Sequence, residues 1–523
     1  MITSLYVYDP LNDALKILGG KVFLNSVIAL KRINQNIMII VNFLAKIQCG
    51  LAVLLYAQFC SLSFVTCFWR FYVRDVFCGL LGLVILSKIP LHSATKAVLL
   101  IDLCVLPEKR FVNGETNQIV EKMDAEVIIA GGGPTGLMLA NQLGHRGIDT
   151  YIFEKSVAPA RTSRAIGITP PSLEIMRPCG LDVALMRAGV QVQRAVIHGT
   201  KYLLGTVDFT RIAGDYPYIL AVPQYEVETI LRANLAKYPS VKVATDVTVD
   251  AAFQDRDAVY VSCRTSDKEP MASYSASLFC LCEGDKGGLR QTFGCNTDSK
   301  RYRDTFLMAD FRHDSGLEND AHLFFTRYGA VESFPLPGGQ RRWVVQTAHF
   351  MDEIPPGFLE MQVYQRTGFR LDGEDMIWQS PFGTKRRIES TYYKGRMLLA
   401  GDAAHVMPPI GGQGMNTGFM DACFLAQTIM HTRDNTTGAE RRAHLSGYYE
   451  SMRKKAAATA ARRARFSMYV GTRKHLLPSM LRNVAIGLAL HSPVSRLVAP
   501  HFAMLTIPYG APTKDKRKWL FDV

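Results

Sequence analysis

The chain has 523 residues, of which 48% are apolar and 20% are charged, and its formal net charge is +14. This length and composition predict two to four domains with large cores. The basic charge suits an anionic cofactor, phenolate substrates or a membrane surface. The sequence contains no nucleic-acid-binding motif and no basic-aromatic array, so nucleic acid is not an expected partner. Its 11 cysteines form no C-x-x-C pair and no zinc spacing, so no metal site is expected.

The first 122 residues form a hydrophobic N-terminal extension with 12 Lys or Arg and 7 Asp or Glu, a net charge of +5. Within it, residues 47–69 contain no charged side chain and are long enough to span a bilayer. Three interpretations stay open: a membrane anchor, a soluble helical addition, or an extension that does not belong to the mature protein. The last is motivated by Met123, which stands directly before the first predicted strand.

A first glycine-rich segment follows a short apolar run, residues 126–130, that predicts a buried parallel strand. Gly131, Gly133 and Gly136 then give the G-x-G-x-x-G spacing of a dinucleotide-binding turn. A helix is expected over 136–146, where its N-terminal N–H groups favour phosphates. A second strand over 149–153 places Glu154 where a carboxylate binds ribose hydroxyls. This segment fits both FAD and NAD.

A second glycine-rich segment begins at Gly401, 265 residues after Gly136, and favours FAD. Residues 396–400 predict another buried strand, which is followed by Asp402, a Pro- and Gly-rich loop and a helix over 415–431. A carboxylate at a strand end can accept hydrogen bonds from sugar-alcohol hydroxyls. The helix N-terminus can stabilise the anionic reduced flavin. A nicotinamide cofactor has neither a ribityl chain nor such an anion.

These motifs resemble the class A FAD-dependent monooxygenases, the para-hydroxybenzoate hydroxylase-like aromatic hydroxylases. That family shows a glycine-rich turn, then Arg-Ala-x-Gly, found here at 164–167, and then Gly-Asp-Ala-Ala-His, found here at 401–405. A flavin-contacting Gln before a helix corresponds to Gln224. The resemblance runs from about residue 123 to about residue 452 and implies FAD as cofactor, with NADPH or NADH as electron donor.

The resemblance also implies the cofactor-binding residues. They are Gly131, Gly133, Gly136, Glu154, Arg164 and Gln224 for the adenosine, pyrophosphate and ribityl parts, Asp402 for the ribityl side, Pro408 at the reacting edge of the ring, and Gly414, Met415 and Asn416 at its pyrimidine end. The central family motif, Asp-Gly-x-x-Ser-x-Val-Arg, is altered here. Glu283 or Asp285 replaces its aspartate, and Gly287 replaces its serine. Handling of the reduced nicotinamide is therefore less firmly implied than FAD binding.

The implied fold class is α/β, with a Rossmann-like FAD-binding domain interleaved with a mixed-sheet substrate domain, C-terminal helices and the hydrophobic N-terminal extension. The expected FAD-binding parts are 123–195, 223–305 and 386–452, the substrate parts are 196–222 and 306–385, and the C-terminal helices are 453–523. The tail is too short for a thioredoxin-like domain, which indicates the compact branch of the family. The catalytic part is expected in the cytoplasm, and at a membrane if residues 1–122 are present.

Aromatic residues of the middle part form either an apolar pocket or ordinary sheet core. They are Tyr202, Tyr216, Tyr218, Phe324, Phe325 and Phe334. His198 and His349 are candidate catalytic bases, although histidines in such positions are more often structural. His405 is expected to order the flavin loop. Cys280 and Cys282 alternate along a strand and are expected in the core. The sequence assigns no catalytic base and leaves the oligomeric state open.

The implied reaction is hydroxylation of a phenolic or polycyclic aromatic substrate through a flavin C4a-hydroperoxide formed with O2, as part of specialised-metabolite biosynthesis. One alternative is a flavin reductase or dehydrogenase that does not oxygenate. Another is a non-catalytic, membrane-tethered flavoprotein, motivated by residues 47–69 and by the altered central motif.

Overall fold

The computed structural model describes residues 124–160, 162, 165–200, 202–265, 270–294, 297–313, 316–433 and 443–507. All of them belong to the second of two compact units, Met1–Gln118 and Ile119–Val523. The predicted N-terminal extension, its apolar stretch 47–69 and Arg164 lie outside the described residues. Within the described ranges, no helix combines the length and the apolar character that crossing a bilayer requires.

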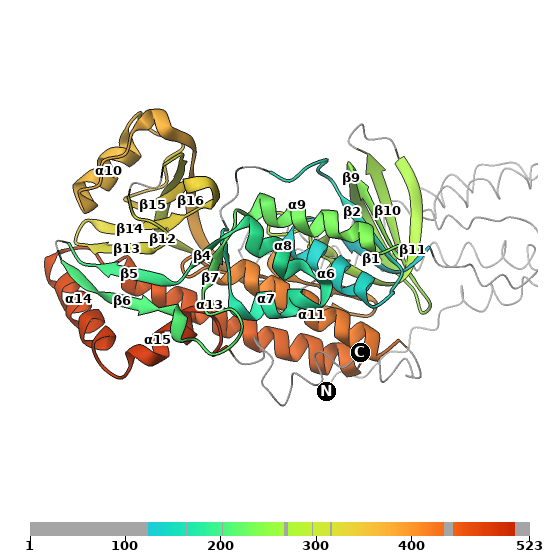
Figure 1. Cartoon of the computed structure of the whole chain (residues 1–523). Helices are drawn as coiled ribbons and strands as arrows, with labels where there is room; N and C mark the ends of the chain where they lie inside the picture. Colours follow the sequence, from blue (N-terminus) through green and yellow to red (C-terminus); the bar gives the residue numbers. More distant parts are fainter. Residues whose placement is uncertain are drawn as a thin grey trace, which may run out of the picture. The chain divides into compact units, whose positions relative to one another are not determined.

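The first sheet has the order β17-β18-β11-β1-β2-β8, and β9 and β10 extend it from β11 (Figure 1). Its strands are β1 (Ala125–Ala130), β2 (Thr150–Glu154), β8 (Val241–Thr245), β9 (Val247–Gln254), β10 (Val259–Thr265), β11 (Pro270–Leu281), β17 (Tyr393–Lys394) and β18 (Met397–Leu399). The pairs β1–β11, β1–β2, β2–β8 and β11–β18 are parallel. The predicted strands at 126–130, 149–153 and 396–400 are therefore confirmed as the centre of a parallel sheet.

Five helices pack against one another beside this central sheet, whose strands are buried, continuous apolar runs. They are α6 (Pro134–His145), α7 (Pro170–Met176), α8 (Leu181–Ala188), α9 (Gln224–Asn234) and α11 (Gln413–His431). Helix α11 packs against α6 and is almost wholly buried. Cys280 and Cys282 are buried in the same core, as predicted.

The second sheet has the order β19-β16-β12-β15-β14-β13-β5-β6. Its strands are β5 (Arg194–His198), β6 (Leu203–Asp208), β12 (Thr297–Phe311), β13 (Ala321–Thr326), β14 (Gly329–Pro335), β15 (Arg341–Thr347), β16 (Met376–Glu389) and β19 (His405–Val406). Only β13 and β5 pair in parallel, so the sheet is mixed, as predicted. Helix α10 (Phe358–Thr367) packs its Leu359 and Val363 with Trp343 on one face.

Three short strands form a small third sheet in the order β3-β7-β4. They are β3 (Gly167–Ile168), β4 (Val190–Val192) and β7 (Ile219–Ala221). The long strands β12 and β16 contain two of the predicted domain boundaries, after residues 305 and 385. The chain passes from the first sheet to the second through β12 and returns after β16. For this reason the predicted boundaries at 305 and 385 fall inside these strands.

The C-terminal part is helical, as predicted. A π-helical segment, His444–Glu450, leads directly into α13 (Ser451–Gly471), and α14 (Leu476–Leu490) and α15 (Ser495–Phe502) follow. Helices α14 and α15 contact β6 at the edge of the second sheet (Figure 1). The α/β fold class, with its parallel and mixed sheets and C-terminal helices, is thus confirmed for the described residues.

Candidate cofactor site

The first glycine-rich turn joins the end of β1 to the start of α6. Gly131 has φ +106°, and a Cβ there would lie 2.5 Å from the carbonyl oxygen of Cys282. A Cβ at Gly136 would overlap the carbonyl oxygen of Gly131. These two glycines therefore allow the turn and the close packing that the sequence predicts for them.

Gly133 differs, because a Cβ at this position would meet no atom within 4 Å. It is the N-cap residue of α6, and the first turn of this helix contains no acidic residue. Open space in front of unpaired helix N–H groups suits the pyrophosphate of a dinucleotide. The residues present at this turn therefore fit the predicted cofactor.

Glu154 lies at the end of β2 and faces the same turn. Its Oε2 accepts a hydrogen bond from the Gly132 N–H at 2.5 Å, and its Oε1 accepts one from Ser156 N–H at 2.8 Å. Nearby, Gln224 begins α9 and donates from Nε2 to Glu228 Oε1 at 2.7 Å. Burial, with a smaller contribution from the Glu154 charge, raises the pKa of Glu228. Glu154 and Gln224 therefore lie near each other, and their contacts with a cofactor stay predictions.

The two glycine-rich segments meet at Thr135, in the first turn of α6. A Cβ at either Gly401 or Gly418 would overlap the Thr135 side chain. Gly401 starts the turn after β18, and Gly418 lies inside α11. Segments 265 residues apart in the sequence therefore pack against each other, which is the arrangement required to hold one cofactor from both sides.

The second segment presents an exposed loop before α11. Gly411 and Gly412 are exposed with φ of +85° and +65°, and α11 has no acidic residue in its first turn. Pro408 is buried, whereas Gly414 and Met415 are half-buried. A positive helix terminus behind an accessible glycine loop favours an anionic ligand group.

The Asn416 side chain is buried and fully hydrogen-bonded. Its Oδ1 accepts from Ser172 Oγ at 2.7 Å and from the Thr169 N–H at 2.9 Å. Its Nδ2 donates to the carbonyl oxygens of Gly167 and Gly412 at 2.8 and 2.7 Å. The side-chain amide therefore fixes the loop before α11. The predicted contact of Asn416 with a ligand can then involve only its backbone, and it stays a prediction.

Asp402 is accessible to solvent, although protein surrounds it densely enough that burial raises the pKa of its carboxyl. A carboxylate that reaches solvent from densely packed surroundings can accept hydrogen bonds from the hydroxyls of a bound sugar alcohol. The turn behind it is fixed by Asp421, whose carboxylate accepts from the Gly401 N–H at 3.0 Å and from His405 Nε2 and Arg453 Nε at 2.6 Å each.

Asp421, His405 and Arg453 are all buried. Burial opposes ionisation of Asp421, but His405 and Arg453 outweigh it and hold its pKa below the usual value. His405 therefore orders the turn, as predicted. Sequence reasoning missed Asp421 and Arg453, because neither lies within a glycine motif.

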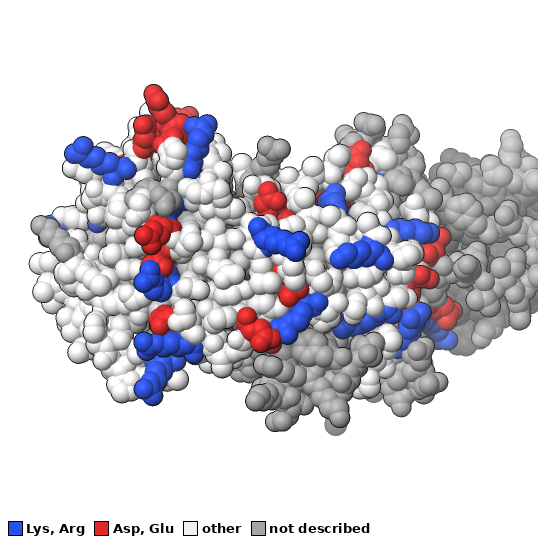
Figure 2. Space-filling model, viewed as in Figure 1, with Lys and Arg blue, Asp and Glu red and all other residues white. Residues whose placement is uncertain are grey.

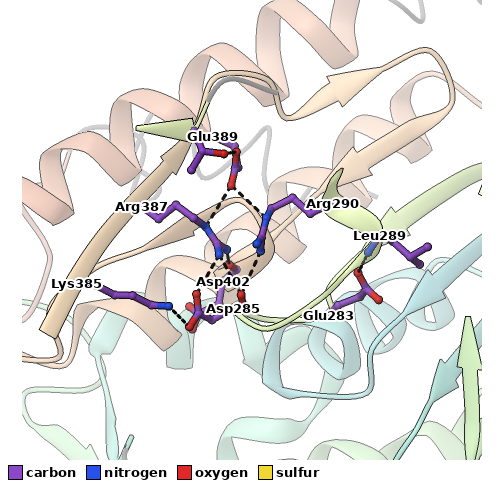
Figure 3. A network of polar contacts seen from close by, with 9 residues as sticks. Glu283, Asp285, Leu289, Arg290, Lys385, Arg387, Glu389 and Asp402 are labelled. Atoms are coloured by element: carbon purple, nitrogen blue, oxygen red, sulfur yellow. Dashed lines mark hydrogen bonds and ion pairs between the residues drawn. The ribbon is translucent and has the colours of Figure 1, made fainter. Parts of the chain in front are cut away.

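The altered central motif forms the network shown in Figure 3. Glu283 accepts a hydrogen bond from the Leu289 N–H at 3.2 Å, and burial raises its pKa. A Cβ at Gly287 would lie 2.7 Å from Glu283 Oε2. The two departures from the family pattern are therefore in contact, and Glu283 braces the short 3₁₀ helix Leu289–Phe293.

Asp285 connects this loop to the second sheet through β16. Arg387 donates to Asp285 Oδ1 at 3.0 Å and to the carbonyl oxygen of Asp402, and Lys385 forms a further ion pair with Asp285 (Figure 3). Glu389, whose side chain is completely buried, pairs with Arg387 at 3.1 Å and with Arg290 at 3.4 Å. The central motif thus ties the Asp402 turn to the second sheet.

A row of directly opposed residues crosses the second sheet beside the flavin loop. Leu323, Glu332, Val344 and Met308 pair in this order on β13, β14, β15 and β12, so their side chains share one face. Met308 and Val344 form an apolar cluster with Phe306 and Phe382, and Ile410 of the flavin loop packs on it. This face is therefore an apolar surface next to the predicted reacting edge.

Glu332 is the carboxylate of this row. It is half-buried, and burial raises its pKa to about 7. No hydrogen bond or ion pair joins its side chain to another residue in the described part of the chain. On the same face, the buried Arg342–Asp310 ion pair, with Nε to Oδ1 at 2.7 Å, lies two residues along β15 and β12 from Val344 and Met308. Sequence reasoning missed Glu332, because only strand register places it on this face.

The proposed aromatic pocket residues divide into several groups. Tyr216 and Tyr218 are buried in the core of the first sheet, and Phe324 is buried under α10. The core interpretation therefore holds for these three. Tyr202 is exposed, whereas Phe325 and Phe334 pack at the β5–β6 end of the second sheet.

The two candidate histidine bases lie away from the site. His198 Nε2 is hydrogen-bonded to His322 Nδ1 at 2.9 Å, and its ring stacks on Phe324, on the face opposite Glu332. Burial lowers the pKa of His198. His349 is exposed after the end of β15. Both positions fit a structural role.

Comparison with known proteins identifies the family. Residues 124–464 match the family model described as FAD binding domain, so the chain belongs to this family, whose cofactor is FAD. The chain is 30% identical over 335 residues to 6-methylpretetramide 4-monooxygenase of Streptomyces rimosus, a match that covers 60% of this chain and 59% of that protein. The matches to the first curated relatives span about three fifths of their lengths.

Two solved structures share the fold. One is p-nitrophenol 4-monooxygenase PnpA from Pseudomonas putida DLL-E4, with a TM-score of 0.66, 20% identity, and coverage of 74% of this chain and 99% of that one. The other is CabE, an aromatic hydroxylase from angucycline biosynthesis, with a TM-score of 0.59, 27% identity, and coverage of 73% and 76%. The fold is therefore that of the class A flavin hydroxylases, as the sequence motifs indicate.

Proposed function

We propose that this protein is an FAD-dependent monooxygenase that uses NADPH or NADH and O2 to hydroxylate a phenolic or polycyclic aromatic compound. The observation that carries the proposal is the packing of Ile410, from the flavin loop, on the apolar cluster of the second sheet. It juxtaposes the predicted flavin edge with a surface able to hold an aromatic ring. The relatives named above, two monooxygenases and an aromatic hydroxylase, support the reaction class.

The protein's own residues would bind and orient the reactants. The N-terminus of α6 and the space beside Gly133 would hold the pyrophosphate, Glu154 the ribose and Asp402 the ribityl hydroxyls. The N-terminus of α11 would stabilise negative charge at the pyrimidine end of the ring. When bound, FAD would supply hydride acceptance and oxygen activation.

Glu332 is the group that we propose to accept the substrate hydroxyl proton. A carboxylate in an apolar row, with no partner among the residues that the structure describes, can hydrogen-bond a phenol placed against Val344 and Met308. A pKa of about 7 suits a general base near neutral pH. The apolar neighbours would also exclude water from the reacting atoms.

The test uses the purified full chain loaded with FAD, in air, with NADPH or NADH and a panel of phenols. We expect oxygen uptake to rise with a suitable phenol, and the product to carry one oxygen atom from isotopically labelled O2. Reduction of the flavin without oxygen transfer would instead indicate a reductase. Bound FAD that neither nucleotide reduces would indicate a non-catalytic flavoprotein.

A matched pair of variants tests the role of Glu332. Glu332→Gln should lower kcat/KM by about 10²-fold or more, the typical contribution of a general base, with FAD binding unchanged. Glu360→Gln, on α10 and away from this face, is the control and should match the wild type. Equal activity of Glu332→Gln and the wild type would remove Glu332 from the mechanism but would leave the monooxygenase proposal standing.

The location and pathway are also part of the proposal. We propose that the catalytic part works in the cytoplasm. If the N-terminal extension is present, residues 47–69 would anchor it to a membrane. A role in specialised-metabolite biosynthesis is supported by the likeness to a hydroxylase from angucycline biosynthesis.

A further inference from the structure

Helix α14 buries polar residues and exposes most of its large apolar residues, although Ile486 and Leu490 pack inward on the second sheet. Ser479, Arg482 and Asn483 are its buried residues. Arg482 donates to the carbonyl oxygen of Arg473 at 2.8 Å and to that of Phe325 at 2.6 Å. A surface helix of a globular protein normally buries its apolar residues, so α14 is unusual in burying Ser479, Arg482 and Asn483 while a longer apolar face stays exposed.

The outward face of α14 is a continuous apolar stripe, which we call the α14 stripe: Leu477, Met480, Leu481, Val484 and Leu488. Their spacing of three or four residues places them on one side of the helix, and each is between 53% and 69% exposed. Of 21 exposed large apolar side chains in the described residues, ten lie between residues 466 and 497. In Figure 2 the surface over α14 carries almost no charged side chain. So concentrated a patch marks an interaction surface.

The polar surroundings of the α14 stripe are strongly basic. Residues 451–507 contain ten Lys or Arg and no Asp or Glu. A cavity of about 820 Å³ lies where the end of α13 meets the start of α14, and Arg462, Arg465, Arg473 and Lys474 line it. Arg303 also lines this cavity, and among the described residues Asp304 is the one acidic residue that does so.

We propose that the α14 stripe docks on a lipid membrane that carries anionic headgroups, with the helix lying in the plane of the interface. Apolar side chains beside a basic rim are the features of an interfacial amphipathic helix, and each nearby Lys or Arg adds attraction to anionic lipid. The basic cavity would take the headgroup phosphates, while the stripe enters the acyl boundary.

Charge argues against two other occupants of this surface. In a symmetric dimer the patch would face itself, so residues 451–507 of both copies would bring basic side chains and no acidic partner to the interface. Residues 1–122 carry a net charge of +5 and would not neutralise the basic cavity either. An anionic lipid surface offers acyl chains for the apolar stripe and negative headgroups for the basic cavity.

The experiment measures co-sedimentation of the full chain with vesicles of phosphatidylcholine alone, or of phosphatidylcholine with phosphatidylserine. One variant combines Leu481→Glu with Leu488→Glu in the stripe. A second combines Arg462→Glu with Arg465→Glu. The matched control combines Met361→Glu with Tyr364→Glu on α10, where both side chains are similarly exposed, at 45% and 48%. All variants retain residues 47–69, so they differ only in the surface under test.

We expect the wild type and the α10 control to bind the anionic vesicles. The stripe variant should bind about tenfold or more weakly, because two leucines no longer enter the bilayer. The arginine variant should also bind weakly, and added salt should weaken wild-type binding. Unfolding curves that match the wild type would show that the variants fold.

Three results would overturn the proposal. The first is a wild type that does not sediment with anionic vesicles. The second is a stripe variant that binds as tightly as the wild type, which would assign the membrane affinity to residues 47–69. The third is a stripe variant that converts a dimer to a monomer in light scattering without changing vesicle binding, which would assign the surface to a second copy of the chain.

Discussion

At the scale of single residues, neighbouring glycines of one motif serve different purposes. Gly131 and Gly136 are required by backbone packing, since a side chain at either would collide with the main chain. Gly133 has open space around its α-carbon and a φ of −77°, which any residue can adopt. Glycine is therefore needed at this position to leave room for the predicted pyrophosphate, and not to let the chain fold.

The first residue-scale prediction separates folding from cofactor binding. Gly133→Ala should leave the thermal unfolding of the apoprotein unchanged but weaken FAD binding by about tenfold or more, because the added methyl displaces a charged group from its hydrogen bonds. Flavin fluorescence titration measures the affinity. Gly447→Ala, where a Cβ also meets no atom, is the control and should bind FAD as the wild type does. Equal affinity in both variants would contradict the assigned pyrophosphate site.

The second residue-scale prediction concerns the pH dependence of stability at Glu332. Its pKa is raised from 4.5 to about 7 in the folded state, so the unfolded chain loses this proton at lower pH than the folded protein does. The wild type should therefore lose stability relative to Glu332→Gln as pH rises from about 5 to about 7, and the difference should then level off. Urea unfolding of both proteins across this range is the measurement. A difference independent of pH would show that folding does not raise the pKa of this carboxyl.

At the scale of elements, the Asp402 turn is held by partners from distant parts of the chain. Asp421 of α11 and Arg453 of α13 fix the turn from behind, and Arg387 of β16 reaches the Asp402 carbonyl oxygen from the second sheet. These contacts make the position of the predicted ribityl ligand depend on three elements. The glycine motif by itself supplies only the backbone freedom that the turn requires.

Arg387 gives the prediction at this scale. Arg387→Met should lower the free energy of unfolding by about 3 kcal/mol, because it removes one ion-pair partner of the completely buried Glu389. Arg386→Met is the adjacent control. Its partner Asp298 is exposed, so the loss should stay below about 1 kcal/mol. Chemical unfolding compares the two, and similar losses would show that the network in Figure 3 contributes no more than a surface pair.

At the scale of the whole molecule, the two large sheets are coupled through the central motif and the flavin loop. Asp285 and Arg387 join them by an ion pair, and Ile410 packs on the second sheet. A ligand held by the first sheet should therefore stabilise the second as well.

The corresponding prediction uses tryptophan fluorescence, since Trp343 is buried in the second sheet. FAD at about 100 times its Kd should stabilise the folded protein by about 2.7 kcal/mol. The unfolding transition seen by tryptophan should shift together with the one seen by flavin release. A tryptophan transition that does not move with added FAD would show that the second sheet unfolds independently.

The sequence alone determined the elements around the cofactor turns, because a strand, a glycine turn and a helix are encoded by neighbouring residues. The 126–130 strand, the helix after Gly133 and the helix that follows Gly412 were all predictable for this reason. Local spacing also placed Glu154 at the end of its strand.

Tertiary structure decided the features that depend on residues far apart in the chain. Thr135 packs between Gly401 and Gly418, Asp421 joins three segments, and Glu332 reaches the apolar face only through the register of β13, β14 and β15. No local pattern encodes such pairings, because strand register and helix packing are set by the whole core. The outward apolar face of α14 is decided in the same way, since its buried side is defined by Arg482 and the carbonyl groups that it contacts.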